Sequence, residues 1–171
     1  IPMADIALDF HSGGKTLDFV PFASAHVLEN KTQQAACVAA ANAFNAPYTA
    51  IMLEIDNIGM YDTAVEDKGK VFVTTELCGG GTATARSIAI AKRGVRNVLR
   101  HAGILAGDTI LEPTIQLDMP DADCFVFCEG GGMIEPMVDL GDKVAKGDVV
   151  AKVWATDRTG VAPVEYHAKR S

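Results

Sequence analysis

Three side chains with the chemistry of a metal-assisted site lie in two apolar segments. Asp9 and His11 close the segment that begins at Ile6, and Glu76 lies near the end of the segment 71–78. Residues two apart on a strand point to the same side, so Asp9 and His11 are expected to share a face. A metal-binding histidine usually donates its second ring N–H to a carboxylate, which makes this pair a candidate ligand with its orienting partner. The pattern alone also allows a histidine at a strand end that simply enters a turn.

Glu76 stands out because its neighbours are apolar or β-branched. Burying an unpaired charge is costly, so this carboxylate must be paired, protonated or next to a metal. A glutamate in a dry cleft beside a metal and its water has the chemistry of a general base. A glutamate at a strand end that reaches solvent, or the N-terminus of the following helix, fits the same pattern.

The residues after His11 form a candidate binding loop. Gly13 and Gly14 allow the backbone to approach a ligand closely. Lys15 and Thr16 follow them and are candidates to face a substrate carboxylate, with a plain solvent-exposed loop as the alternative.

Other residues carry weaker signals. His26 and Glu29 have the H-x-x-E spacing of zinc ligands, but Glu29 also leads into a helix expected from residue 31, and this favours the structural interpretation. His101 is expected at a helix C-terminus, where a cation suits the helix dipole. The glycines 79–81 lack the G-x-G-x-x-G pattern and the lysine of nucleotide-binding loops.

The spacing of apolar residues predicts an α/β region followed by an all-β region. In the first region, strands are expected at 6–10, 48–55 and 71–78. Helices are expected at about 31–44 and about 84–101. Alternating strands and helices indicate the α/β class. After about residue 107, short apolar stretches alternate with Gly, Asp and Pro turns, as in all-β structure. We therefore expect a boundary between two domains, 1–108 and 109–171.

Composition excludes some partners. The net charge is −7 and the basic residues are dispersed, which argues against a nucleic-acid surface. No apolar run is long enough to span a membrane, and no signal peptide is visible. The four cysteines form no C-x-x-C pair. We expect buried free thiols in a reducing cytoplasm, with a zinc or disulfide pair at Cys124 and Cys128 as the alternative.

Two motifs carry a family resemblance. Through "LDFHSGG" (8–14), "TTELCGGG" (74–81) and its Gly/Asp-rich tail, the chain resembles the second half of a member of the succinylglutamate desuccinylase/aspartoacylase family. "DFHSGGKTLDFVPF" and "ELCGGGTATARSIAIAKRGVRNVLRHAGIL" resemble in particular the N-acetyl-diaminobutyrate deacetylases of ectoine degradation. The resemblance implies part of a zinc carboxypeptidase-like mixed sheet with helices over 1–108. Over 109–171 it implies a small, incomplete, barrel-sandwich-like β-domain.

The resemblance also implies roles for single residues. His11 matches the last zinc ligand of the family, Asp9 matches the acid that orients a ligand, and Glu76 matches the glutamate that activates the zinc-bound water. Cys78 stands where the family more usually has glycine. The family's first two ligands, an H-x-x-E pair, and a substrate-binding arginine precede the histidine strand. Nothing precedes Ile1 here, so we expect a fragment.

The resemblance implies an enzyme that removes an acyl group from an N-acyl amino acid such as N-acetyl-2,4-diaminobutyrate. The expected acyl group is acetyl, and the expected cofactor is Zn²⁺. The expected partner is this small molecule, neither nucleic acid nor membrane, and assembly as a homo-oligomer stays open. The alternative is a catalytically inactive binding or scaffold fragment of the family. The tail also resembles half of a biotinyl/lipoyl module, but it lacks the Met-Lys-Met attachment hairpin, so no covalent cofactor is expected.

Overall fold

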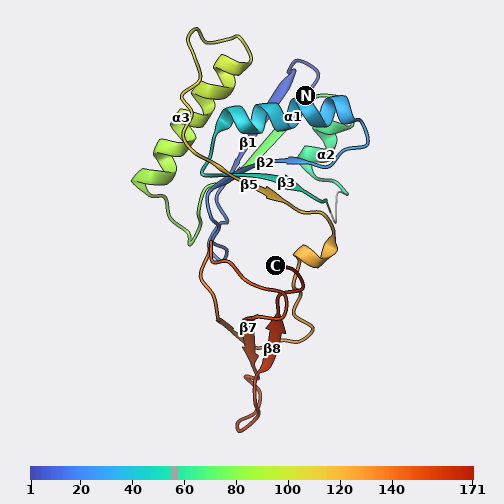
Figure 1. Cartoon of the computed structure of the whole chain (residues 1–171), viewed down its shortest axis with the longest axis vertical. Helices are drawn as coiled ribbons and strands as arrows, with labels where there is room; N and C mark the ends of the chain where they lie inside the picture. The colour runs from blue at the N-terminus through green and yellow to red at the C-terminus, as the bar shows by residue number, and fades with distance from the viewer. Residues whose placement is uncertain (55–57) are drawn as a thin grey trace. The chain divides into compact units, whose positions relative to one another are not determined.

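The computed structural model describes residues 1–54 and 58–171, and the chain divides into two compact units, Ile1–Met119 and Pro120–Ser171 (Figure 1). The elements of the first unit are β1 (Ile6–His11), β2 (Phe22–His26), α1 (Lys31–Phe44), β3 (Tyr48–Met52), α2 (Tyr61–Glu66), β4 (Val71–Glu76), α3 (Ala85–His101) and β5 (Ile115–Asp118). The five strands form one mixed sheet in the order β1-β4-β2-β3-β5. Only the β2–β4 pair is antiparallel among these strand pairs. The expected α/β class is confirmed.

The first of the expected helices begins at a strong cap. The Asn30 side chain accepts hydrogen bonds from the backbone N–H groups of Thr32 and Gln33, each at 3.1 Å. Gln33 stands where a reciprocal capping-box partner is expected. Its side-chain amide instead donates to the carbonyls of Glu66 and Lys70, at 2.8 and 2.9 Å. The cap therefore consists of the Asn30 hydrogen bonds alone, and the Gln33 side chain links α1 to the end of α2 and the residues that follow it.

Side-chain alternation gives the five-stranded sheet two different faces. On one face, small and β-branched residues such as Ala23, Ala25 and Val73 pack under α1, and α3 packs against α1 (Figure 1). Phe44 of α1 is fully buried in this core. The other face carries the alternate residues of the same strands, and α2 contacts β4. Tyr61 packs edge-on against Phe72 there, with ring centroids 5.6 Å apart. Asp9, His11 and Glu76 thus lie on the face opposite the main core.

The second unit is a small β structure. It contains a short 3₁₀ turn and a three-stranded antiparallel sheet in the order β6-β7-β8, whose elements are η1 (Ala122–Cys124), β6 (Met133–Pro136), β7 (Val149–Trp154) and β8 (Val164–His167). Side-chain contacts across the sheet include a 3.0 Å ion pair between Lys152 and Glu165 and a 2.6 Å hydrogen bond from the Trp154 indole to Glu135. The expected small C-terminal β structure is confirmed.

The expected boundaries differ in detail from the structure. The strand expected at 48–55 ends at Met52, and residue 55 lies outside the described residues. β5 lies beyond residue 108, in the stretch that composition assigns to the β region, yet it pairs in parallel with β3 of the larger sheet. Its pairing partner, rather than its composition, places this short strand.

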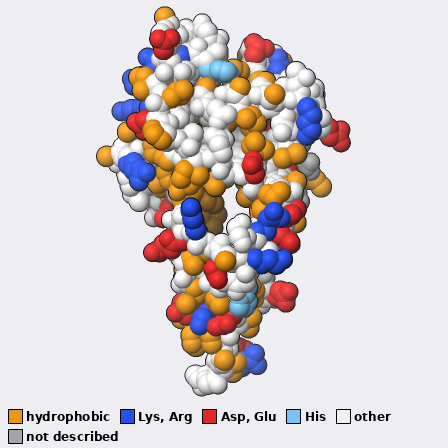
Figure 2. Space-filling model, in the orientation of Figure 1, with side chains coloured by type: hydrophobic (Ala, Val, Ile, Leu, Met, Phe, Trp, Pro, Cys, Tyr) orange, Lys and Arg blue, Asp and Glu red, His pale blue; other side chains and the backbone are white. Residues whose placement is uncertain are grey.

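The four cysteines were expected to be buried free thiols. All four cysteines are free, but only Cys37 is buried, and Cys128 is exposed, so the expectation of buried thiols is wrong for Cys128. Burial raises the pKa of the Cys37 thiol, although the backbone N–H of Phe72 partly offsets this. Lys and Arg side chains gather along α3 (blue in Figure 2). None of the described helices combines the length and apolar character needed to cross a membrane.

Candidate active site and metal-binding residues

His11 and Glu76 lie side by side at the ends of two adjacent strands. β1 and β4 are parallel, and their register places His11 beside Glu76 and Asp9 beside Thr74. Because paired residues on neighbouring strands share a face, all these side chains point away from the α1 core. His11 and Glu76 both line one cavity of about 310 Å³. The structure therefore brings together the two residues singled out in the sequence.

The His11 ring is held by Asp9. Nε2 of His11 lies 2.9 Å from Oδ2 of Asp9. When Nε2 carries the hydrogen and donates it to this carboxylate, the lone pair of Nδ1 is available to a metal. The His11 side chain is 53% exposed, so a cation can reach it.

Glu76 is fixed by the glycine loop that follows His11. The backbone N–H of Gly13 donates to Oε2 of Glu76 at 2.6 Å. Gly13 has a left-handed φ of +64°, and a Cβ at this position would lie 2.7 Å from the carbonyl oxygen of Leu17. A side chain is thus excluded where the backbone turns towards Glu76. The carboxylate is satisfied by this loop, which explains how it is tolerated on an otherwise apolar strand.

Lys15 and Thr16 lie on the same loop but outside the cavity lining. Both residues are exposed. The loop rests on the glycines that follow β4, because Gly81 donates to the Gly14 carbonyl at 2.7 Å and Gly80 to the Leu17 carbonyl at 2.9 Å. A substrate contact of Lys15 or Thr16 remains a proposal.

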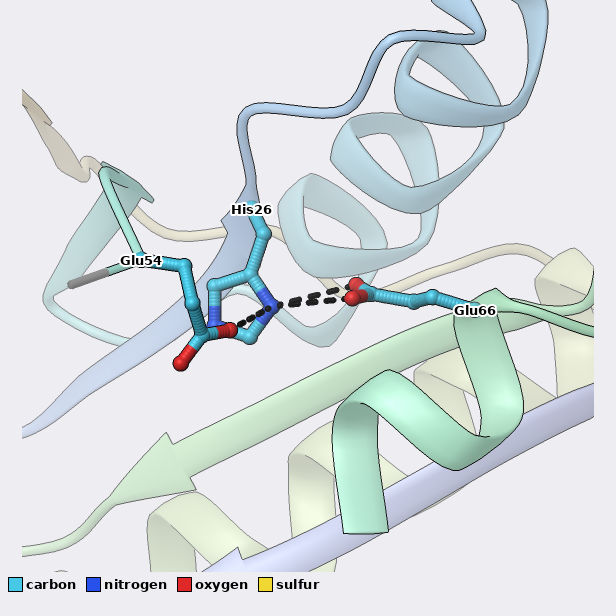
Figure 3. A group of neighbouring side chains, drawn as sticks. All are labelled: His26, Glu54 and Glu66. Carbon is cyan, nitrogen blue, oxygen red and sulfur yellow. Dashed lines mark hydrogen bonds and ion pairs between the residues drawn. The ribbon is translucent and has the colours of Figure 1, made fainter. Parts of the chain in front are cut away.

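A second group of polar side chains surrounds His26 at the end of β2. Figure 3 shows the imidazole between Glu54, which follows β3, and Glu66, the last residue of α2. Nδ1 of His26 lies 3.1 and 3.3 Å from the two oxygens of Glu66 and 3.6 Å from Oε2 of Glu54. One ligand atom from each residue lies within 4.8 Å of the others, so the group could hold a metal ion.

The charge state of His26 follows from these neighbours. Its side chain is buried, and burial by itself lowers the pKa of a histidine. The hydrogen bond to Glu66 and the negative charges of Glu66, Glu54 and Asp62 together outweigh burial and raise the pKa of His26 above 6.5. A proton or a divalent cation on Nδ1 would satisfy the same carboxylates.

The acidic residue nearest to His26 is not Glu29, the partner that the H-x-x-E spacing would give. The acidic partner of His26 is Glu66, 40 residues further along the chain, whereas Glu29 does not belong to the group of possible ligands. Sequence reasoning missed this group because Glu54 and Glu66 approach His26 only after the sheet and α2 have formed. The small-residue segment "FASAH" carried one overlooked signal, an alternation that places His26 on the same face as Phe22 and Ser24 of β2.

The fold and these residues define a class of protein. The model of the succinylglutamate desuccinylase/aspartoacylase catalytic domain matches residues 1–102. The chain belongs to this family of metal-dependent deacylases, as its two motifs suggested.

Particular relatives are close in sequence. The chain is 52% identical over 172 residues to the N-alpha-acetyl-L-2,4-diaminobutyric acid deacetylase of Halomonas elongata, covering 99% of this chain and 50% of the relative. The product-bound structure of the ectoine utilization protein EutE (DoeB) from Ruegeria pomeroyi shares 68% identity at a TM-score of 0.93, covering 99% and 52% of the two chains. A succinylglutamate desuccinylase from Silicibacter sp. TM1040 shares 66% identity at a TM-score of 0.88, covering 99% and 51%. The chain thus spans about half the length of these relatives.

Proposed function

We propose that the full-length protein containing this chain is a zinc-dependent deacylase that removes the acetyl group from N-acetyl-2,4-diaminobutyrate or a similar N-acyl amino acid. The observation that carries this proposal is the in-register pair of His11 and Glu76, facing one cavity of about 310 Å³. The name of the Halomonas relative supports the choice of acyl group and amino acid.

The donor set at His11 fits a metal. Asp9 holds the Nε2 side of the ring at 2.9 Å, and this leaves Nδ1 as the donor atom. Zinc, when bound, supplies Lewis acidity, lowering the pKa of water from 15.7 to about 7 and polarising the substrate carbonyl. We propose that the remaining ligands lie in the half of the relatives that this chain does not span. The group around His26 is the competing location for a cation.

Glu76 has the position of a general base. With Oε2 held by the Gly13 N–H, Oε1 is the oxygen that accepts a proton from the attacking water. The water oxygen bonds to the amide carbon, the C–N bond breaks, and Glu76 returns the proton to the leaving amine. Asp9 keeps the His11 ring oriented throughout.

Two variants of the full-length protein test these roles. Glu76→Gln should retain zinc and lose about 10²–10⁴-fold in kcat, the typical contribution of general acid–base catalysis. His11→Ala should lower the zinc content measured by elemental analysis. His101→Ala, at the exposed end of α3, serves as the histidine control and should change neither quantity. The proposal is wrong if Glu76→Gln turns over like wild type, or if His26→Ala, rather than His11→Ala, removes the zinc.

A further inference from the structure

The basic residues of α3 line a concavity in the larger unit. Its volume is about 600 Å³, and it shares no lining residue with the cavity of His11 and Glu76. Two apolar side chains and four cations form the lining, namely Ala89, Lys92, Arg93, Arg96, Arg100 and Ile110. None of the described residues that line it is acidic, although the chain has a net charge of −7. The concavity is therefore a site of positive charge on an acidic protein.

The segment that carries Ile110 is fixed against α3 by hydrogen bonds. Asn97, which is fully buried, accepts from the backbone N–H of Ile110 at 2.9 Å and donates to its carbonyl at 2.8 Å. The Glu112 carboxylate pairs with Arg93 at 2.7 Å, and its backbone N–H donates to the Asn45 side chain at 2.6 Å. Satisfied buried polar contacts of this kind make a structure rigid, so the concavity has a defined shape.

Three of the four cations repeat along one face of α3. Lys92, Arg96 and Arg100 are each four residues apart, and residues at this spacing are neighbours on a helix. Among the described residues, no acid forms an ion pair with any of these three. Like charges at this spacing destabilise a helix, and the helix dipole favours cations in the last turn alone, which contains Arg100. The protein itself therefore does not compensate Lys92 and Arg96.

Two of the guanidinium groups also contain a buried N–H without an acceptor. The Nε atoms of Arg93 and Arg100 are buried and have no hydrogen-bond partner among the described residues. An unpaired buried N–H is costly. The Arg93 side chain is nevertheless held by Glu112, whereas no such ion pair holds Arg100. The Arg100 guanidinium therefore gains hydrogen bonds if it turns towards an anion that enters the concavity.

We propose that this concavity binds the phosphate groups of a small polyphosphorylated anion. Guanidinium groups bind phosphate through paired N–H donors, and Lys92 adds a point charge. The row from Lys92 to Arg100 extends over about 12 Å, at the helical rise of about 1.5 Å per residue, which favours a chain of phosphate groups over a single one. None of the described lining residues is aromatic, so no base can stack there, and this argues against single-stranded nucleic acid as the ligand. The inference does not depend on the proposed function.

Titration calorimetry of the full-length protein with sodium tripolyphosphate tests the site. We expect saturable binding that weakens as NaCl is added, because salt screens exposed charges. Arg96→Gln should weaken binding about tenfold, the lower end of the range for a hydrogen bond to a charged group, since Arg96 is exposed. Arg86→Gln is the matched control, because it removes the same charge from an exposed position of α3 outside the concavity. Its affinity should stay close to that of wild type.

Three further measurements complete the experiment. ATP carries the same triphosphate chain and should bind about as tightly as tripolyphosphate. His11→Ala should keep the binding, because tripolyphosphate also chelates metals and must be shown to bind away from the proposed zinc site. Removing one of three like charges should leave the midpoint of urea unfolding of Arg96→Gln equal to or slightly above that of wild type, so that a loss of binding is not a loss of folding.

Several results would overturn the proposal. The full-length protein would show no saturable binding of tripolyphosphate, or it would bind ATP alone and so recognise the nucleoside. Equal losses of affinity in Arg86→Gln and Arg96→Gln would show a general attraction to basic residues rather than a site. A loss in His11→Ala but not in Arg96→Gln would place the anion at the proposed zinc site.

Discussion

Gly13 holds Glu76 through its backbone, with its N–H 2.6 Å from the Oε2 oxygen. The contact joins the loop after β1 to the end of β4, next to the backbone bond from Leu77 to the His11 carbonyl. The glycine is required for geometry rather than flexibility. Its φ of +64° is unfavourable for other residues, and an added Cβ would lie only 2.7 Å from the carbonyl oxygen of Leu17. The loop therefore orients the residue proposed as the general base.

Gly13 and Gly14 form a matched pair for testing this contact. Both have positive φ, but a Cβ on Gly14 would meet nothing within 4 Å. We expect Gly14→Ala to cost about 1–2 kcal/mol of unfolding free energy from backbone strain alone. Gly13→Ala should cost about 1–3 kcal/mol more because it also clashes with Leu17.

Urea unfolding measures both costs, and kcat in the full-length protein reports the position of Glu76. We expect Gly13→Ala, but not Gly14→Ala, to lower kcat. Equal effects of the two alanines on stability and kcat would contradict the positioning role of Gly13.

Cys78 occupies a backbone conformation that favours glycine, with a φ of +71°. An L-residue there costs roughly 1–2 kcal/mol, while glycine costs about 0.5–1 kcal/mol through its flexible unfolded state. Cys78→Gly should therefore raise the unfolding free energy by about 0–1.5 kcal/mol, from the difference of these terms. Cys78→Ala, which keeps the strain, is the control. A Cys78→Gly protein that unfolds at lower urea than Cys78→Ala would rule out this explanation.

The sequence predicted those helices and strands that begin at helix caps or consist of apolar runs. α1 begins at the Asn30 cap, and α3 begins at a reciprocal cap formed by Thr84 and Ser87. β1 and β4 are apolar runs, and both were expected. β2, with its small residues, and the short helix α2 were missed, because tertiary packing rather than propensity stabilises them.

The same distinction applies to the site. Asp9 and His11 are two residues apart, so strand periodicity was enough to place them together. Glu76 was found as a charge on an apolar strand, an anomaly visible without a structure. His26, Glu54 and Glu66 come from separate elements, and no local pattern connects them. Their proximity depends on the β2–β3 pairing and on the position of α2.

Gly94 lets α3 approach the buried ring of Phe44. A Cβ on Gly94 would lie 2.3 Å from a ring carbon of Phe44, so this fully buried ring or the helix would have to shift within a packed core. Helix propensity favours alanine over glycine by about 0.8–1 kcal/mol, but overpacking costs about 1–3 kcal/mol and should dominate. Gly94→Ala should therefore lower the midpoint of urea unfolding. In the Gly94→Ala/Phe44→Leu double variant the loss should be smaller than the sum of the two single losses, and simple additivity would contradict the contact.

His26 should make stability depend on pH in a defined direction. Its folded-state pKa is raised above 6.5, so its ion pair with Glu66 contributes fully below pH 6.5 and is lost as the pH rises through the folded-state value. We expect His26→Gln to cost about 1.5–3 kcal/mol in mild acid, the range for a hydrogen bond to a charged group, and less in alkaline solution. Urea unfolding of both proteins across this pH range, with a chelator present, gives the difference at each pH. His101→Gln, at the exposed end of α3, is the control and should follow wild type. A difference that stays constant, or that widens as the pH rises, would show that the His26–Glu66 pair is not held together by a proton.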